Sequence, residues 1–458
     1  MSENRNIFAQ KVDFDTPSLQ CKVFDRLAVQ NSSGKTQFYC LELSAGNTFD
    51  FGFCRKENVQ SLLREVLTVV NMKVLRGAYE RIMIPSVPCA LWVKQARKYD
   101  PKSVIMWLEN SLELTEEYKE SILRLYKLGM KFAVRVDAMG EIPSDKEILS
   151  CIDYVLVDVS KTQEFVDIVT SLKKSNKNLK TIGFKDSCSI FNFTAQEAKR
   201  FDYVLGMVQS ELIKYDGVRP KWQHDMLRLF AQLYSSFYDI KEVGEIVAQY
   251  PLMGTAMKKL MSSKALTTLT LRAKAKNQML TDNQALTQND LRNYLVISVA
   301  FNLFTLTDKK ISDLNHQPFD MRQINYEPFI QALVFGKIVD FMGQELCDDI
   351  SAPQSFISGF MRYCHVFLHD TEKATFSEFP LDAVSSCYKE SGGEQLGKII
   401  RTLSLLFEHK IADALTLAYD EGMELYKEKI YNYISQSLLW TDTVLKALDI
   451  VQTPVESE

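Results

Sequence analysis

The segment 365–370 carries the residue types of a metal site. It reads His365-Val366-Phe367-Leu368-His369-Asp370, so two histidines stand four positions apart and an aspartate follows the second. Residues four apart share one face of a helix, and two histidines placed in this way can bind a single metal ion. The alternative is a helix end, where histidines lie favourably near the negative pole of the helix dipole. His316 upstream and Asp382 downstream are candidates for further ligands of such a site.

Two charged residues stand at the ends of apolar runs. Asp158 lies near the end of the run 154–159, and Lys185 directly follows the run 181–184. Together they could bind a polar ligand. The simpler interpretations are that Asp158 caps the following loop, with Lys161 as an ionic partner, and that Lys185 is a solvated surface lysine.

One stretch of the chain is strongly basic. Between Glu245 and Asp282 there are six basic residues and no acidic one, although the whole protein has a net charge of −4. The six are Lys258, Lys259, Lys264, Arg272, Lys274 and Lys276. Such a segment can bind an acidic partner, or it can simply be a solvated helix face. Aromatic residues that could stack on bases are absent after Tyr250, so nucleic acid is an unlikely ligand.

Composition excludes several classes of protein. The chain has 458 residues, of which 46% are hydrophobic and 24% charged, as in a globular protein of two or three domains. Nine cysteines are spread singly, which indicates neither a disulfide framework nor a zinc site. There is no apolar leader, and the uncharged stretch 293–307 is shorter than the ~20 residues of a membrane span. We therefore expect a cytoplasmic protein that has no membrane contact and no cofactor.

The elements that must position these residues differ between two halves. Up to about residue 208, short apolar runs alternate with helical patterns, which predicts a parallel α/β sheet or barrel. The predicted strands are 36–43, 81–84, 104–108, 132–136, 154–159, 181–184 and 203–208. Thr115 followed by two glutamates marks the start of one helix, and Gly129 marks its end.

From about Trp222 the pattern predicts helices only. The apolar residues Met226, Leu229, Phe230 and Leu233 follow helical spacing, and Asp239 can cap the next helix, which Pro251 ends. Further helices are predicted at 289–306, 327–346, 354–369, 381–391, 394–408 and 411–439. The glycine and proline of segment 216–220 make it the predicted boundary, so the expected domains are 1–215, 216–446 and a polar tail at 447–458.

The helical half resembles an HDOD domain, a relative of the HD metal-dependent phosphohydrolases that lacks their ligands. The resemblance lies in the segments 243–253, 259–263 and 287–300, and in a C-terminal extension at 356–361 and 379–381. The first half resembles a degenerate EAL domain through segments 7–12, 154–158 and 201–206. The resemblance implies a bacterial EAL–HDOD signalling protein in which a truncated TIM-like barrel precedes an all-helical domain.

An active EAL domain hydrolyses cyclic di-GMP with divalent metals held by carboxylates, since hard cations prefer oxygen ligands. The resemblance matches the carboxylate positions of that family to Phe24 or its neighbour Asp25, to Trp107, to the pair Arg135 and Val136, and to Phe184 or Lys185. Asp137 is one residue out of phase with the pair. Only Asp158 and Lys185 match the family, and they cannot hold two metals.

The sequence therefore predicts a non-enzymatic regulatory scaffold that binds another signalling protein. Lys258, Lys259, Arg272 and Lys274 are its candidate partner contacts. Two alternatives stay open. One is a cyclic di-GMP sensor or weak phosphodiesterase that uses Asp158, Lys185 and Asp25, and the other is an HD-type phosphohydrolase that uses His365, His369 and Asp370.

Overall fold

The computed structural model describes fifteen segments of the chain. These are residues 22–45, 66–67, 70–85, 100–108, 115–136, 145–185, 191–209, 220–235, 239–275, 288–314, 324–347, 352–367, 395–408, 410–420 and 427–450. None of the helices within these segments is long and apolar enough to cross a bilayer.

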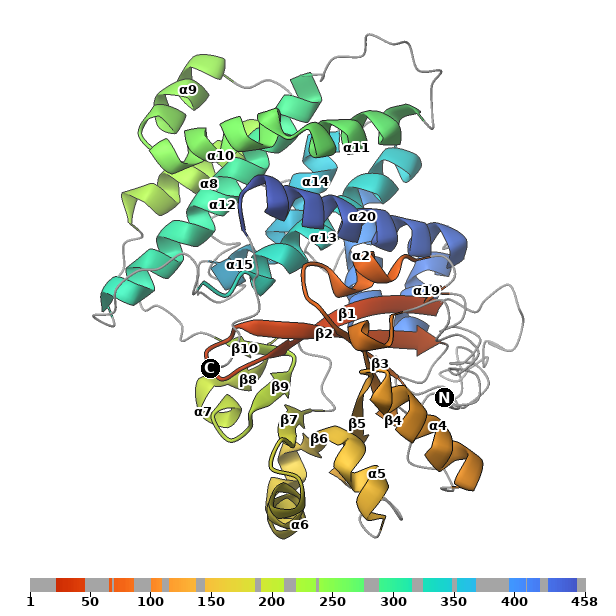
Figure 1. Ribbon diagram of the computed structural model, residues 1–458. Coiled ribbons are helices and arrows are strands. Elements are labelled where there is room, and N and C mark those ends of the chain that lie inside the picture. Colours follow the sequence, from red (N-terminus) through yellow and green to blue (C-terminus); the bar gives the residue numbers. More distant parts are fainter. Residues whose placement is uncertain are drawn as a thin grey trace, which may run out of the picture.

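Eight strands of the first half close into a barrel in the order β1-β2-β3-β4-β5-β6-β7-β9 (Figure 1). They are β1 (Lys22–Gln30), β2 (Thr36–Ala45), β3 (Ile82–Pro85), β4 (Val104–Leu108), β5 (Lys131–Arg135), β6 (Ile152–Asp158), β7 (Lys180–Phe184) and β9 (Tyr203–Leu205). Strand β1 is antiparallel to both of its neighbours, and the other pairs are parallel. The expected TIM-like barrel is therefore confirmed.

Short helices connect most of these strands. They are α2 (Met72–Arg76), α4 (Glu116–Lys127), α5 (Lys146–Cys151), α6 (Thr162–Ser175) and α7 (Ala195–Ala198). The predicted cap of α4 is present, because the Thr115 side chain accepts a hydrogen bond from the Tyr118 amide. Gly129 follows α4 with a φ of 95°, a conformation that favours glycine. Strands β8 (Phe191–Thr194) and β10 (Met207–Gln209) form a separate two-stranded parallel sheet.

The first two strands form a hairpin with no helix between them. The Asn31 side chain closes its turn by accepting hydrogen bonds from the amides of Ser33 and Lys35, at 3.1 and 2.9 Å. Gly34 supplies the positive φ, 78°, that the turn requires. Strand β1 was not among the predicted strands, and the opening strand inferred at 7–12 lies outside the described segments.

After Gln209 the described residues form helices only. They are α8 (Lys221–Tyr234), α9 (Ile240–Ala248), α10 (Pro251–Ser262), α11 (Lys264–Ala275), α12 (Gln288–Leu314), α13 (Glu327–Leu346), α14 (Ala352–Met361), α15 (Cys364–Phe367), α18 (Gln395–Phe407), α19 (Ile411–Asp420) and α20 (Lys427–Ala447). The helix predicted at 327–346 has those bounds, whereas the one predicted at 411–439 is divided between α19 and α20. The predicted helix 381–391 falls outside the described segments.

Helix α13 is the centre of the helical half. Most of its residues are buried, and it packs very closely against α14 through glycines on both helices. A Cβ added at Gly359 of α14 would lie 2.7 Å from the Val339 Cβ and 2.9 Å from the Gly336 Cα of α13. The two backbones can approach this closely only because glycine has no side chain.

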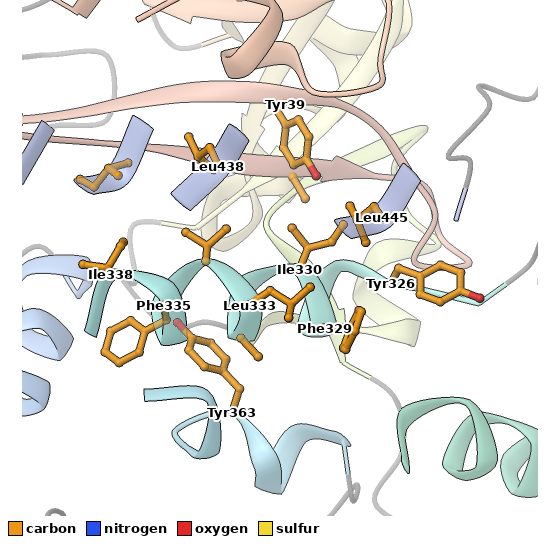
Figure 2. Close-up of a cluster of buried hydrophobic side chains, with 14 of the residues drawn as sticks. Tyr39, Tyr326, Phe329, Ile330, Leu333, Phe335, Ile338, Tyr363, Leu438 and Leu445 are labelled. Atoms are coloured by element: carbon orange, nitrogen blue, oxygen red, sulfur yellow. The ribbon is translucent and has the colours of Figure 1, made fainter. Parts of the chain in front are cut away.

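The helical half covers the outer face of the β1–β2 hairpin. Figure 1 shows α20 lying along the hairpin. In Figure 2 the Tyr39 side chain of β2 points toward α13 and lies among side chains of α13 and α20. The Phe24 ring of β1 contacts the Tyr431 ring of α20, with centroids 5.5 Å apart. Helices of the second half therefore cover the strand face that a connecting helix covers elsewhere in a barrel of this type.

Candidate site at the carboxyl end of the barrel

The carboxyl ends of the parallel strands meet at one end of the barrel, which is where barrel enzymes build their sites. In β4 and β7 the interior residues nearest this end are Trp107 and Phe184, and both belong to the buried cluster that fills the barrel. Arg135 of β5 joins them, because its guanidinium carbon lies 4.8 Å from the centre of the Phe184 ring. Two aromatic rings and a guanidinium, all of them buried, therefore lie at this end of the barrel.

Asp158 ends β6 at the same end of the barrel. Its Oδ1 accepts hydrogen bonds from the Ser160 amide at 2.9 Å and from the Ser160 hydroxyl at 2.7 Å. These bonds hold the turn that leads into the 3₁₀ segment Val159–Lys161. The geometry matches the simpler of the two interpretations, a strand-end carboxylate that caps the next loop.

Lys185 follows β7 and forms an ion pair. Its Nζ lies 2.8 Å from Glu197 Oε1 and 5.1 Å from the centre of the Phe193 ring. The ammonium group and the Thr194 amide hold the pKa of Glu197 below its ordinary value. Lys185 is thus not a freely solvated lysine, and the two residues predicted to share a ligand are engaged by different partners.

The structure separates the two candidates for the first family carboxylate. Phe24 faces α20 outside the barrel, so its side chain is not part of the site. Asp25 points to the opposite face of β1, where it stands directly across from Glu42 of β2. Both carboxylates are buried, with 9% and 6% of their surfaces exposed.

Glu42 was missed in the sequence, although a signal was present. In β2 it is in phase with Phe38 and Cys40, whose side chains belong to the barrel-filling cluster. Burial and, after it, the charge of Glu42 raise the pKa of the Cys40 thiol above its ordinary value. The strict alternation of this strand would have placed Glu42 on the inner face.

Metal ligands do not gather among the side chains that the structure describes, since no three His, Cys, Asp or Glu residues are close enough to share an ion. Asp137, His369 and Asp370 lie outside the described segments. His365 lies in α15, but its side chain is not described.

The described lysines of the basic segment differ in their surroundings. Lys259 Nζ lies 2.8 Å from Asp449 Oδ2, so this lysine ties α10 to the end of α20. Lys258 and Lys264 are exposed. Arg272 and Lys274 lie in α11, and their side chains are outside the described set.

Comparisons with known proteins find similar solved structures, of which two are described here. No protein-family model and no curated protein matches the chain. A structure described as the PaMucR phosphodiesterase in complex with cyclic di-GMP is 11% identical, with a TM-score of 0.28, over 40% of this chain and 89% of that one. The Bacillus subtilis YkuI protein, described as having an EAL domain and bound to its substrate cyclic di-GMP and to calcium, is 12% identical, with a TM-score of 0.30, over 61% and 72%. Similarity at this level carries no conclusion about the activity or ligand of this chain.

Proposed function

We propose that the chain is a non-enzymatic regulatory protein in which the barrel and the helical half form one platform for another signalling protein. The observation that carries this proposal is the composition of the barrel end. Trp107, Arg135 and Phe184 lie at this end of the barrel. They stand at the positions that the resemblance to EAL domains matches to the carboxylates of a two-metal site. A guanidinium is always positively charged, so Arg135 also opposes a dication nearby.

The direct test is turnover of cyclic di-GMP by the full chain with Mg²⁺ and, separately, with Mn²⁺. We expect no linear dinucleotide product above the rate without protein. Metal-dependent turnover by the wild type that is lost in Asp158→Ala would contradict the proposal and favour a phosphodiesterase.

A nucleotide sensor without turnover is the second candidate. The observation that favours it is the indole of Trp107 and the guanidinium of Arg135 at one end of the barrel. An indole stacks on bases, and a guanidinium binds phosphate. Binding of cyclic di-GMP that is lost in both Trp107→Leu and Arg135→Leu would favour this candidate.

The partner surface that we propose includes the exposed Lys258 of α10. Lys258→Glu should weaken capture of the partner, and the loss should be larger at low salt than at high salt, because exposed charges are screened. Lys259→Glu tests a surface ion pair within the chain instead, since Lys259 binds Asp449. Equal capture by wild type and Lys258→Glu at low salt would remove this surface from the proposal.

A further inference from the structure

We infer that the β1–β2 hairpin couples the carboxyl end of the barrel to the helical half, so that a change in one is transmitted to the other. In the proposed regulatory function, this coupling carries the signal between the barrel and the helical half. Only this regulatory role of the coupling rests on the proposed function. The transmission itself is a property of the packing and can be measured independently.

Residues of the hairpin alternate between two separate buried clusters. Val29, Phe38 and Cys40 belong to the cluster that fills the barrel and includes Trp107. Phe24, Ala28, Tyr39 and Leu41 belong to the cluster shared with the helices of the second half. Because successive side chains of a strand point to opposite faces, any displacement of the hairpin moves both sets together.

The outer face of the hairpin is bonded to α20 through a buried arginine. Arg26 Nη2 donates to Asp442 Oδ1 at 3.0 Å, and its Nη1 donates to the Val74 carbonyl at 2.9 Å. The guanidinium carbon also lies 4.5 Å from the centre of the Tyr39 ring. Burial lowers the Arg26 pKa, but Asp442, Tyr39 and Glu327 together outweigh burial and hold this pKa above its ordinary value. Such a group cannot leave its partner without a large cost in free energy.

A second buried contact joins the hairpin to α13. The Glu327 carboxylate accepts hydrogen bonds from the Tyr39 hydroxyl at 3.0 Å and from the Thr36 hydroxyl at 3.4 Å. Gln331 of α13 donates to its other oxygen at 2.9 Å. Because the donors come from both sides of the interface, the carboxylate holds β2 and α13 in one relative position.

A third contact lies near the hairpin turn. The Gln30 amide nitrogen donates to Asn325 Oδ1, just before α13, at 3.1 Å. The amide oxygen of the same side chain accepts a hydrogen bond from the Val208 backbone at 2.9 Å. One glutamine thus bridges the helical half and strand β10.

These three contacts hold the hairpin to the helical half at several points along its length. Its inner residues pack against the barrel interior, where closely packed side chains transmit a displacement rather than absorb it. A movement of α13 or α20 should therefore reach Trp107 through the hairpin.

The test uses the full chain labelled with 5-fluorotryptophan, whose four tryptophans are Trp92, Trp107, Trp222 and Trp440. Trp107→Phe assigns the Trp107 fluorine resonance. Asp442→Asn should then shift that resonance by more than its line width. The matched control is Asp449→Asn, which changes a 74% exposed carboxylate beyond the same helix and should leave it in place.

Thr36→Val provides a second and milder perturbation, because it removes the hydroxyl that binds Glu327. We expect it to shift the Trp107 resonance too, and it keeps the inference testable if Asp442→Asn does not fold. An unchanged Trp107 resonance in folded Thr36→Val and Asp442→Asn would overturn the coupling and leave the proposed function intact. Turnover of cyclic di-GMP by the wild type would overturn the function and leave the coupling intact.

Discussion

Removing the Asp442 carboxylate should be one of the most destabilising single changes in the chain. Arg26 is buried, with only 2% of its side chain exposed, and Asp442 is 14% exposed. Asp442→Ala leaves the guanidinium buried without its counter-ion, which typically costs about 3–5 kcal/mol. Because Arg26 keeps the Val74 carbonyl and the Tyr39 ring, we expect a loss near the lower end, about 3 kcal/mol.

Urea unfolding followed by far-ultraviolet circular dichroism and by tryptophan fluorescence measures this loss. The control is Asp449→Asn, which changes a surface ion pair with Lys259 and should cost about 0–1 kcal/mol. The double variant Arg26→Met, Asp442→Leu removes both charges and should recover most of the loss, because a buried ion pair can often be replaced by apolar residues. If Asp442→Ala lost no more stability than Asp449→Asn, the buried ion pair would not hold the two halves together.

Three further changes test other parts of the structure. Burial raises the Glu327 pKa above its ordinary value of 4.5, so the folded state favours the protonated carboxyl. The resulting stabilisation is complete below pH 4.5 and is lost as pH rises through the pKa of Glu327 in the folded protein. Wild type should therefore lose stability relative to Glu327→Gln as pH rises. Denaturant midpoints of the two proteins at a series of pH values measure this loss, and a difference in midpoint that does not change with pH would refute the prediction. Gly359→Ala should lower the free energy of unfolding by about 1–3 kcal/mol through overpacking against α13. Gly254 is exposed and an added Cβ would meet nothing within 4 Å, so Gly254→Ala should raise the free energy of unfolding by about 0.5–1 kcal/mol. Equal thermal midpoints for the two variants would contradict the close packing of α13 and α14. Lys185→Met should lower the free energy of unfolding by less than about 1 kcal/mol at neutral pH. Because the ion pair lowers the pKa of Glu197, this loss should shrink as pH falls below 4.5. A loss in urea unfolding that is the same at every pH would contradict this titration of the ion pair.

The apolar strands and the amphipathic helices could be predicted from the sequence. The run 104–108 is strand β4 with the same bounds, and 327–346 is helix α13. Both patterns are local, because burial on both faces or around a whole helix requires a continuous run of apolar residues. Capping by Thr115 was predictable for the same reason, since its hydrogen bond reaches only three residues along the chain.

The hairpin and its contacts could not be predicted in this way. Asp25 and Arg26 interrupt the apolar pattern of β1, and their burial depends on elements far along the chain. The partner of Arg26 is Asp442, 416 residues away, and Tyr39 binds a carboxylate 288 residues away. Buried charges stay buried only with such partners, and a single sequence does not show which distant residues meet.

The candidate site was predicted in part. Trp107 and Arg135 were singled out through the family resemblance, and in the structure both face the barrel interior. The alternation of side chains along β2 would have found Glu42. Phe24 and Asp25 stayed alternatives, because strand β1 was not predicted and the outward direction of Phe24 toward Tyr431 was therefore not known. Lys185 was interpreted either as a ligand-binding residue or as a solvated lysine. Its ion pair with Glu197 was not foreseen, because it depends on how the segment after β8 folds back.

The measurement that tests the central claim most directly is a calorimetric titration of cyclic di-GMP into the full chain, with Mg²⁺ and again with Mn²⁺. A non-enzymatic protein whose barrel end is filled by Trp107, Arg135 and Phe184 should give no binding heat at high micromolar ligand with either metal. Metal-dependent binding that is lost in Asp158→Ala would contradict the account, because it would show that the barrel still holds a working nucleotide and metal site.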